Sequence, residues 1–224
     1  LRLDIKQNYI VKGRQFEGYR KIAPLSEVIL KVRFKKNEIF LYDVVATLFG
    51  INSVIPQLQK TLSETFLPIT VGGGIDTIEK VDECFLMGVD RLALNSVNFR
   101  DLSVMNYIAK KYGRQSAVAH VEAKLIDRKW HAMFQNGREI GSSDIVTHIK
   151  NLTECGVGEI ILSAVDHDGM LSGFPKELVS IINDFVEVPV ILSGGITSFG
   201  DKALYGEYES VKGLSISRGI LEIL

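Results

Sequence analysis

A duplicated spacing pattern constrains the fold of this chain more than any other feature. Residues 70–74 read TVGGG and residues 191–195 read ILSGG, so a short β-branched run ends on glycines twice. After the last glycine, a serine follows at the same spacing in both copies, at Ser96 and at Ser217. A helical pattern lies between the glycines and the serine each time. The repeated unit is therefore strand, glycine turn, helix and strand.

Two further segments extend the repeat to the first strand of each copy. LRLDIK at residues 1–6 and AVAHVEAK at residues 117–124 are apolar runs in which an acid, Asp4 or Glu122, stands two residues before a lysine. We therefore expect two fused copies of a four-strand unit. Two half-barrels related by a twofold axis would place Asp4 and Glu122 at equivalent positions around one mouth.

Strand-like runs alternate with amphipathic helical patterns along the chain, which is typical of βαβ units around a parallel sheet. The expected strands are Leu1–Ile5, Glu38–Tyr42, Pro68–Val71, Arg91–Leu94, Ala117–Val121, Glu159–Leu162, Pro189–Leu192 and Gly213–Ile216. The expected helices include Val54–Thr65, Ile78–Met87, Ser103–Lys111, Asp144–Cys155 and Lys176–Phe185. This order predicts an α/β fold, a (β/α)8 TIM barrel forming a single domain over residues 1–224. A doubly wound open sheet is the alternative.

Composition excludes several classes of function. The formal net charge of −1 provides no broad positive field for a polyanion such as DNA, so no nucleic-acid partner is expected. Cys84 and Cys155 lack metal-ligand spacing, which indicates reduced thiols and a cytoplasmic protein. No apolar run is long enough for a membrane span, and no signal peptide is visible. The four histidines show no metal spacing, and we expect neither a metal nor a cofactor.

The paired acids are the leading candidates for catalysis. Side chains at the C-terminal ends of barrel strands face the active-site mouth. There, Asp4 and Glu122 would act as general acid and general base on opposite faces of one substrate. The structural alternative is an ion pair of each acid with the lysine two residues on, Lys6 or Lys124. The symmetric placement at two strand ends favours the catalytic interpretation.

The glycine turns are candidates for anion binding. Glycines let backbone N–H groups approach an anion, and the N-terminus of the following helix favours negative charge. A tight turn that needs a positive φ explains any single glycine equally well. Two such turns, each paired with a serine one strand later, predict two phosphate sites. The expected substrate is therefore elongated, with a phosphate at each end.

Three other segments have local interpretations. Residues 163–174 follow the sixth strand and contain acids that would bind substrate hydroxyls or phosphate, or form an Asx-rich turn. Residues 127–139 alternate around a QNG turn and predict a hairpin inserted after the fifth strand. Gln7–Pro24 is expected to be a long polar loop that acts as a lid. Its Lys12 would close over an anion, or would be a solvated charge.

The chain resembles the cyclase subunit family of imidazole glycerol phosphate synthase over essentially its whole length. The motifs that carry the resemblance are LDIK (3–6), VKG (11–13), FE (16–17), VGGGI (71–75), LNS (94–96), VEAK (121–124), GEIILSAVDHDG (158–169) and ILSGGI (191–196). The resemblance implies a (β/α)8 barrel that accepts ammonia from a separate glutaminase subunit. The implied substrate is a phosphoribulosyl-formimino carboxamide ribonucleotide with two phosphates. The implied products are imidazole glycerol phosphate and an aminoimidazole carboxamide ribotide.

The resemblance also implies roles for individual residues. Asp4 matches the first catalytic aspartate, Glu122 stands where the second is usual, and Lys12 matches a loop lysine near a phosphate. The residues that match the two phosphate sides are Gly74, Asn95 and Ser96 for one, and Asp168, Gly169, Gly194, Gly195 and Ser217 for the other. At the opposite end of the barrel, three charged residues that match the guard of an ammonia passage are Glu38, Arg91 and Glu159, with Asp90 matching a contact to the glutaminase. The fourth guard residue would lie upstream of Leu1.

Departures from the family pattern keep a second function open. Glu122 lengthens the usual acid by one methylene, and Met170 replaces a threonine of the usual DGT motif. The segments TLFG (47–50) and VEAK (121–124) resemble a paralogous branch associated with bacterial surface polysaccharides, in which the barrel relays ammonia to a sugar-modifying amidotransferase. A sugar isomerase of the same fold is a third alternative, disfavoured by the charges matching the glutaminase side. We expect the cyclase, because two phosphate sites would be superfluous in a pure conduit.

Overall fold

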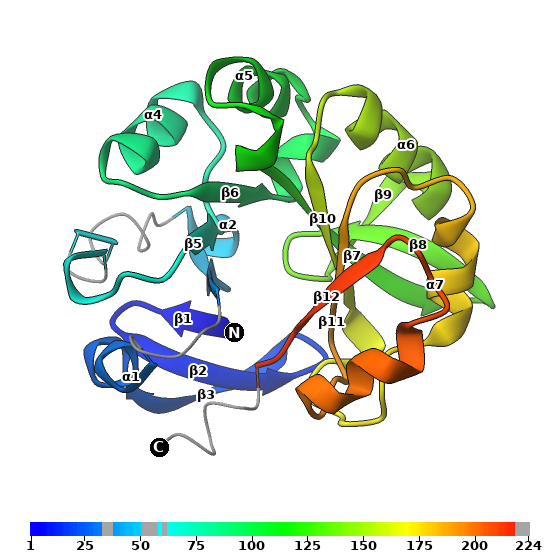
Figure 1. Cartoon of the computed structure of the whole chain (residues 1–224), viewed down its shortest axis with the longest axis horizontal. Coiled ribbons are helices and arrows are strands. Elements are labelled where there is room, and N and C mark those ends of the chain that lie inside the picture. Colours follow the sequence, from blue (N-terminus) through cyan, green and yellow to red (C-terminus); the bar gives the residue numbers. More distant parts are fainter. Residues whose placement is uncertain (33–37, 51–57, 60–61, 218–224) are drawn as a thin grey trace.

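The computed structural model describes residues 1–32, 38–50, 58–59 and 62–217. Within them a twelve-stranded sheet curls into a barrel (Figure 1). The parallel strands that form the wall are, in spatial order, β1 (Arg2–Lys6), β4 (Ile39–Asp43), β5 (Ile69–Gly72), β6 (Arg91–Leu94), β7 (Ala117–Ile126), β10 (Glu159–Ala164), β11 (Val190–Ser193) and β12 (Val211–Ser215). A backbone hydrogen bond of 2.9 Å from Arg2 N to Ile216 O connects β1 with the end of β12. The predicted barrel is confirmed.

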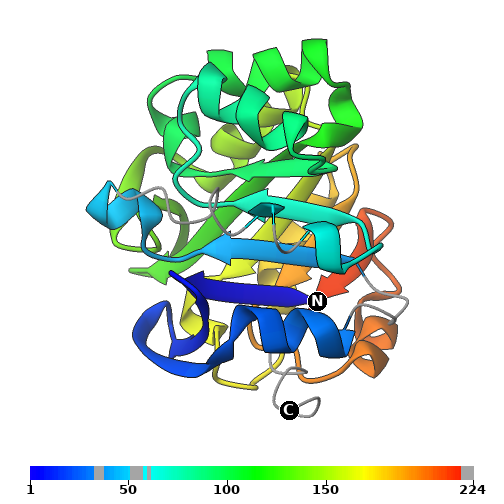
Figure 2. The ribbon, with the colours of Figure 1, turned by 90° about the vertical axis from the view of Figure 1, so that its left-hand side faces the viewer.

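Helices cover the outside of the barrel. They are α1 (Leu25–Val32), α2 (Ala46–Phe49), α4 (Ile78–Leu86), α5 (Ser103–Lys111), α6 (Ile145–Glu154) and α7 (Lys176–Asn183). Figure 2 shows α1 lying along the outer side of β1. Every one of these helices except the four-residue α2 buries one apolar face against the strands, as Leu178, Val179 and Ile182 do in α7. No helix within the described residues has the length and apolar character that crossing a membrane requires.

The observed elements closely match the expected ones. The expected strands all occur, with most boundaries shifted by one or two residues. The expected helix from Asp144 begins one residue later, because the Asp144 side chain is the N-cap and accepts hydrogen bonds from Val146 N and Thr147 N, each 3.0 Å. The expected helix Val54–Thr65 lies partly outside the described residues.

The pairing register shows that the two halves repeat. In the first half, one layer across four neighbouring strands contains Asp4, Tyr42, Gly72 and Ala93. In the second half, the corresponding layer contains Glu122, Ser163, Ser193 and Ser215. Asp4 and Glu122 therefore occupy the same position of the first strand in each half. The duplicated sequence pattern corresponds to two four-strand half-barrels, as predicted.

Two hairpins lie on the barrel mouth. The hairpin predicted after the fifth strand is confirmed, because β7 continues into an antiparallel pair with β8 (Lys129–Phe134), which in turn pairs with β9 (Glu139–Asp144). The expectation of an open loop over Gln7–Pro24 is wrong. This segment forms β2 (Tyr9–Arg14) and β3 (Glu17–Pro24), and β2 pairs with β1.

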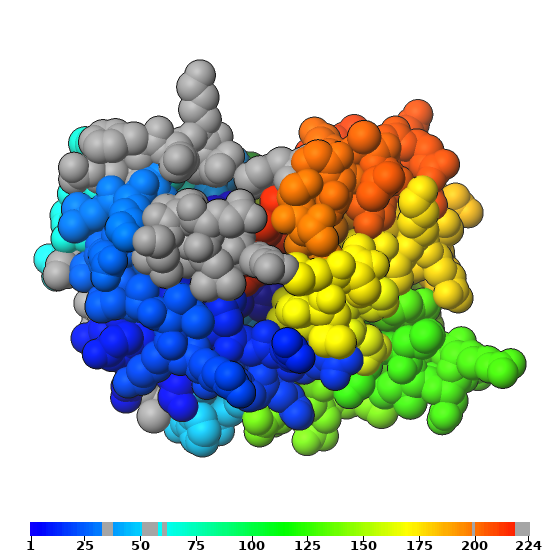
Figure 3. Space-filling view, turned by 90° about the horizontal axis from the view of Figure 1, so that it is seen from below, coloured from blue at the N-terminus to red at the C-terminus, as the bar shows by residue number. Residues whose placement is uncertain are grey.

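The backbone conformation of the β2–β3 turn explains why a loop was expected in place of this hairpin. Gln15 and Phe16 both adopt the left-handed conformation, with φ of 50° and 62°, and so form a two-residue turn without the Asn-Gly pair that usually signals one. Phe16 is almost fully buried, which holds the turn down on the barrel. Gln15 N donates to Asp168 O at 2.8 Å. Figure 3 shows the blue hairpin residues lying against the yellow segment that follows β10.

Candidate active site

Two cavities open at the C-terminal ends of the strands, one for each half of the barrel. The β5–β6 cavity has a volume of about 290 Å³ and the β11–β12 cavity about 250 Å³. The predicted residues that line the β5–β6 cavity are Gly74, Asn95 and Ser96. The predicted residues that line the β11–β12 cavity are Asp4, Lys12, Asp168, Gly169, Gly194, Gly195 and Ser217. The structure therefore brings together each of the two sets that the sequence suggested for phosphate.

The glycine turns that floor the cavities have matching geometry. Gly73 and Gly194 have φ of 97° and 98°, and Gly74 and Gly195 have φ of 72° and 77°. A Cβ on Gly73 would lie 2.3 Å from Asp43 O, and one on Gly194 would lie 2.6 Å from the equivalent oxygen of Ala164. Both the positive φ and the close backbone approach therefore require glycine. Backbone held this tightly is preorganised to present N–H groups to a bound anion.

A matched pair of substitutions separates these two requirements. Gly73→Ala is expected to lower the free energy of unfolding by about 2–5 kcal/mol, because it adds a steric clash to the strain of a positive φ. Gly88 has a nearly identical φ of 96°, but a Cβ added there would have no atom within 4 Å. Gly88→Ala should cost only about 1–2 kcal/mol. Urea unfolding of both variants measures the difference, and equal losses would show that the close approach is unimportant.

Each cavity also contains one lysine and one arginine. Lys80 and Arg100 line the β5–β6 cavity, where Lys80 Nζ donates to Gly74 O at 3.0 Å. Lys12 and Arg14 line the β11–β12 cavity, where Lys12 Nζ donates to Ser217 Oγ. Paired cations beside a glycine turn match the charge and hydrogen-bonding needs of a phosphate.

Asp4 is ionised although it is buried. Arg2 Nε donates to Asp4 Oδ1 at 2.7 Å, and Ser217 Oγ donates to Asp4 Oδ2 at 3.2 Å. Lys12 Nζ lies 3.7 Å from Asp4 Oδ2. Burial alone would raise the pKa of Asp4, but Arg2 and Lys12 outweigh it and hold that pKa below its usual value. Asp4 is therefore a carboxylate at neutral pH, able to accept a proton.

Glu122 has the opposite character. It is fully buried and lines neither cavity. Tyr42 Oη donates to Glu122 Oε1 at 3.0 Å, and Gly137 N donates to Oε2 at 2.7 Å. Burial raises the pKa of Glu122 to about 7, despite the lowering effect of these hydrogen bonds. Glu122 therefore keeps its proton to a higher pH than an exposed glutamate does, which suits a general acid.

The two acids are connected across the centre of the barrel. Arg2 contacts Asp4, its guanidinium carbon lies 5.3 Å from the centre of the Tyr42 ring, and Tyr42 binds Glu122. Neither Arg2 nor Tyr42 was predicted as a site residue. A signal for Arg2 was present, because residues two apart on a strand share a face, and Arg2 precedes Asp4 by two. The structural alternative of ion pairs with Lys6 and Lys124 is wrong for Asp4, whose partners are Arg2 and Lys12.

Asp168 is a third acid at the mouth. It lies in the β11–β12 cavity with Lys12, and its backbone carbonyl accepts the hydrogen bond from the hairpin. Burial raises the pKa of Asp168 to about 6. Burial has the opposite effect on Lys12 and lowers its pKa, because burial disfavours the charged form of either group. Within the described residues, no group of three or more His, Cys, Asp or Glu side chains is arranged to hold a metal ion.

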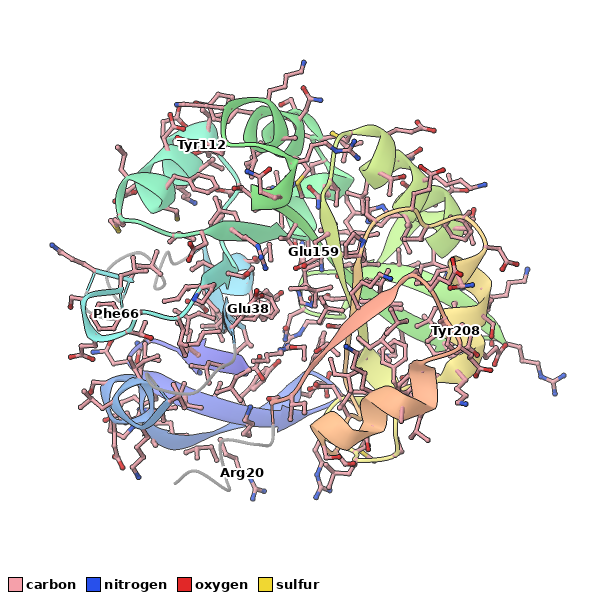
Figure 4. All side chains as sticks on the ribbon, viewed as in Figure 1. Arg20, Glu38, Phe66, Tyr112, Glu159 and Tyr208 are labelled. Atoms are coloured by element: carbon pink, nitrogen blue, oxygen red, sulfur yellow. The ribbon has the colours of Figure 1, made fainter. Side chains whose placement is uncertain are left out.

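The predicted charged residues at the other end of the barrel also meet. Arg91 Nη1 lies 2.8 Å from Glu38 Oε2 and 3.9 Å from Glu159 Oε2, and all three line a cavity of about 650 Å³. Figure 4 shows Glu38 and Glu159 near the centre of the ring of strands. Asp90 does not line this cavity, and its carboxylate accepts a hydrogen bond of 2.8 Å from Ile69 N.

Comparison with known proteins gives a consistent result. Residues 2–216 match the profile of a family described as "Histidine biosynthesis protein". The chain is 34% identical over 197 residues to imidazole glycerol phosphate synthase subunit HisF of Legionella pneumophila, covering 87% of this chain and 93% of that protein. It is 32% identical over 201 residues to the subunit HisF of Chlorobium luteolum, covering 88% and 78% of the two chains. The subunit HisF of Bacillus cereus strain Q1 is 34% identical over 195 residues, covering 86% and 77%.

Proposed function

The chain belongs to the histidine biosynthesis protein family, and on that premise we propose that it is the ammonia-dependent cyclase and lyase subunit of imidazole glycerol phosphate synthase. Its substrate would be the bisphosphorylated formimino-ribulosyl aminoimidazole carboxamide ribonucleotide. The products would be imidazole glycerol phosphate and aminoimidazole carboxamide ribotide. The enzyme would need no metal and no cofactor, because the reaction requires proton transfer and positioning only.

One observation carries this proposal: two acids at equivalent positions of a duplicated barrel have different surroundings, with two cations beside Asp4 and a hydroxyl and a backbone N–H on Glu122. Asp4 is held ionised by Arg2 and Lys12, whereas burial raises the pKa of Glu122 to about 7. Ring closure with ammonia requires one group that removes a proton and one that delivers a proton. Asp4 would be the base and Glu122 the acid.

The cavities support a substrate with two phosphates. One cavity lies at the ends of β5 and β6 and the other at the ends of β11 and β12. The layer that contains the two acids contributes Tyr42 and Ala93 to the first cavity and Asp4 and Ser215 to the second. An elongated substrate anchored at both ends would place its reactive middle over that layer. Anchoring by remote groups is an effective way to orient a reacting centre.

The β5–β6 cavity offers a test that leaves both acids untouched. Lys80→Met removes one cation from this cavity and is expected to raise the KM about tenfold, with kcat within about threefold, since one charge-assisted hydrogen bond contributes about 1.5 kcal/mol or more. Steady-state kinetics measures both constants. The control is Lys150→Met, which removes the same charge from the exposed face of α6. An unchanged KM in Lys80→Met would remove this cavity from the substrate site.

We further propose that a glutaminase subunit supplies ammonia at the end of the barrel where Glu38, Arg91 and Glu159 meet. The exposed Asp90 would contact that subunit from the rim. The free thiols of Cys84 and Cys155 support a cytoplasmic location for the complex.

The proposal is tested by supplying the purified chain with the bisphosphate substrate and excess ammonium salt at mildly alkaline pH. We expect loss of substrate and appearance of imidazole glycerol phosphate, separated by anion-exchange chromatography. Binding of the substrate without turnover would contradict the cyclase and favour the alternative, an ammonia-relaying subunit that serves a sugar-modifying amidotransferase. Neither binding nor turnover would contradict both the reaction and the substrate.

A further inference from the structure

Arg2 is a buried cation whose Nε and Nη1 have hydrogen-bond partners, whereas its buried Nη2 has none among the described residues. Its side chain is fully buried inside the barrel. The rings of Phe16 and Tyr42 lie over the guanidinium, with their centres 5.1 Å and 5.3 Å from its central carbon. Its edge donates through Nη1 to Ser193 Oγ at 3.1 Å and to Ser163 Oγ at 3.4 Å. Desolvating a charge to this degree is costly unless a counter-charge compensates for it.

The counter-charge is Asp4. The two oxygens of its carboxylate have different partners. Oδ1 faces the barrel interior and accepts the 2.7 Å hydrogen bond from Arg2 Nε. Oδ2 faces the groups that line the β11–β12 cavity, Ser217 at 3.2 Å and Lys12 at 3.7 Å. Arg2 itself lines neither mouth cavity. Its contact with the β11–β12 cavity runs through Asp4.

We propose that Arg2 is a positioning residue that fixes Asp4 with Oδ1 engaged and Oδ2 directed at the substrate. The inference rests on the proposed role of Asp4 as the base. A planar guanidinium held by two rings and two serine hydroxyls has one orientation, and its Nε–H then fixes the plane of the carboxylate. The cost of burying both charges is offset because each compensates for the other.

The charges around Asp4 make the contribution of Arg2 testable. The groups that face Asp4 from the packed elements are Arg2 on its own strand, Lys12 on β2, Ser217 beyond β12, Asp168 beyond β10 and Tyr19 on β3. Without Arg2, burial and the nearby Asp168 would both raise the pKa of Asp4, and Lys12 and the Ser217 hydroxyl would oppose them. A base must be ionised to act, so activity at mildly acidic pH would fall first.

A purely structural role for Arg2 predicts something different. The rings of Phe16, Phe40 and Tyr42 would accept an unbranched apolar side chain as well as a guanidinium. Phe40 provides a matched control, because its ring lies 6.0 Å from the Arg2 guanidinium carbon and lines the cavity at the opposite end of the barrel. Phe40→Leu disturbs the packing around Arg2 but leaves the Asp4 contact in place.

The experiment compares Arg2→Gln, Arg2→Lys and Phe40→Leu with the wild-type chain. We expect Arg2→Gln to lower kcat on the order of a hundredfold even at pH 8, where Asp4 stays ionised, with KM within about threefold, because a misplaced catalytic group costs about that factor. The acid limb of its pH profile should also move to higher pH, because Asp4 loses a cation that keeps it ionised. Arg2→Lys keeps the charge but loses the planar fork, and should recover part of the loss at pH 6. Phe40→Leu should show the wild-type pH profile. A kcat in Arg2→Gln equal to that of Phe40→Leu, with the acid limb of the pH profile where the wild-type chain has it, would overturn the proposal.

A second measurement needs no substrate and no turnover. The carboxyl ¹³C shift of Asp4, assigned by comparison with Asp4→Asn, reports its titration directly. In the wild-type chain Asp4 should titrate below the usual aspartate range, and in Arg2→Gln its midpoint should rise by about one pH unit or more, since each unit corresponds to about 1.4 kcal/mol of lost interaction. If Arg2→Gln does not fold, Arg2→Lys and the wild-type midpoint decide the question. An ordinary wild-type midpoint would overturn the proposal, whether or not the chain catalyses the proposed reaction.

Discussion

Asp4→Asn is expected to abolish ring closure, lowering kcat on the order of a thousandfold or more, because an amide accepts no proton from the reacting nitrogen. Asparagine has nearly the same size, and its Oδ1 still accepts the hydrogen bond from Arg2 Nε. The loss is therefore chemical and not steric. Ammonium-dependent turnover, followed by product chromatography, gives the measurement.

The same substitution leaves Arg2 buried without its carboxylate, so a stability loss of about 3–5 kcal/mol is expected. The assay therefore includes circular dichroism of each variant at the assay temperature, and binding of the glutaminase. The control is Asp144→Asn, which makes the same charge change at the N-cap of α6, outside the mouth. Equal loss of glutaminase binding and turnover in Asp4→Asn would contradict the role of Asp4, as would retained turnover.

Glu122→Gln is expected to lower kcat about a hundredfold or more, because it removes the protonated carboxyl that would deliver a proton. Glutamine still accepts the hydrogen bond from Tyr42. Its amide nitrogen, however, cannot accept the one from Gly137 N. Glu122→Asp keeps an acid but shortens it by one methylene, and should retain more activity than Glu122→Gln. Steady-state kinetics of the two variants tests this order, and equal activities would show that Glu122 acts through its size and not its proton.

The sequence was sufficient to predict the barrel and its duplication for a physical reason. A strand that is buried on both faces consists of a short run rich in β-branched residues. Each glycine turn lies so close to a neighbouring backbone that a residue with a Cβ would clash there. Gly73 and Gly194 illustrate this, since each packs against the carbonyl oxygen of the equivalent strand residue. Such requirements can be recognised from a few neighbouring residues in the sequence. The strand order and the equivalence of Asp4 and Glu122 follow from these local patterns and from right-handed βαβ connections.

The errors and omissions concern features that arise only from packing. The β2–β3 hairpin turns at Gln15 and Phe16, whose left-handed conformation is stabilised by the burial of Phe16 and by the contact with Asp168. Neither contact is encoded by neighbouring residues. Tyr42 was also missed, because its role depends on Glu122, a residue distant in sequence that the closure of the barrel brings to 3.0 Å.

The assignments of individual phosphate and gate residues are still predictions. The structure places Gly74 and Ser96 at one cavity and Gly195 and Ser217 at the other. Cavity geometry is a necessary condition for binding, and the Lys80→Met kinetics described above test whether it is sufficient.

The most direct test of the paired-acid mechanism is the pH dependence of kcat with the concentration of free ammonia, not total ammonium, held constant. Glu122 would act as an acid, so it must be protonated, and burial raises its pKa to about 7. The wild-type kcat should therefore fall to half its maximum near pH 7 and decline as the pH rises further. The residual activity of Glu122→Gln should lack this decline. A wild-type kcat that stays constant through pH 8, or a decline that persists in Glu122→Gln, would contradict the assignment of Asp4 as base and Glu122 as acid.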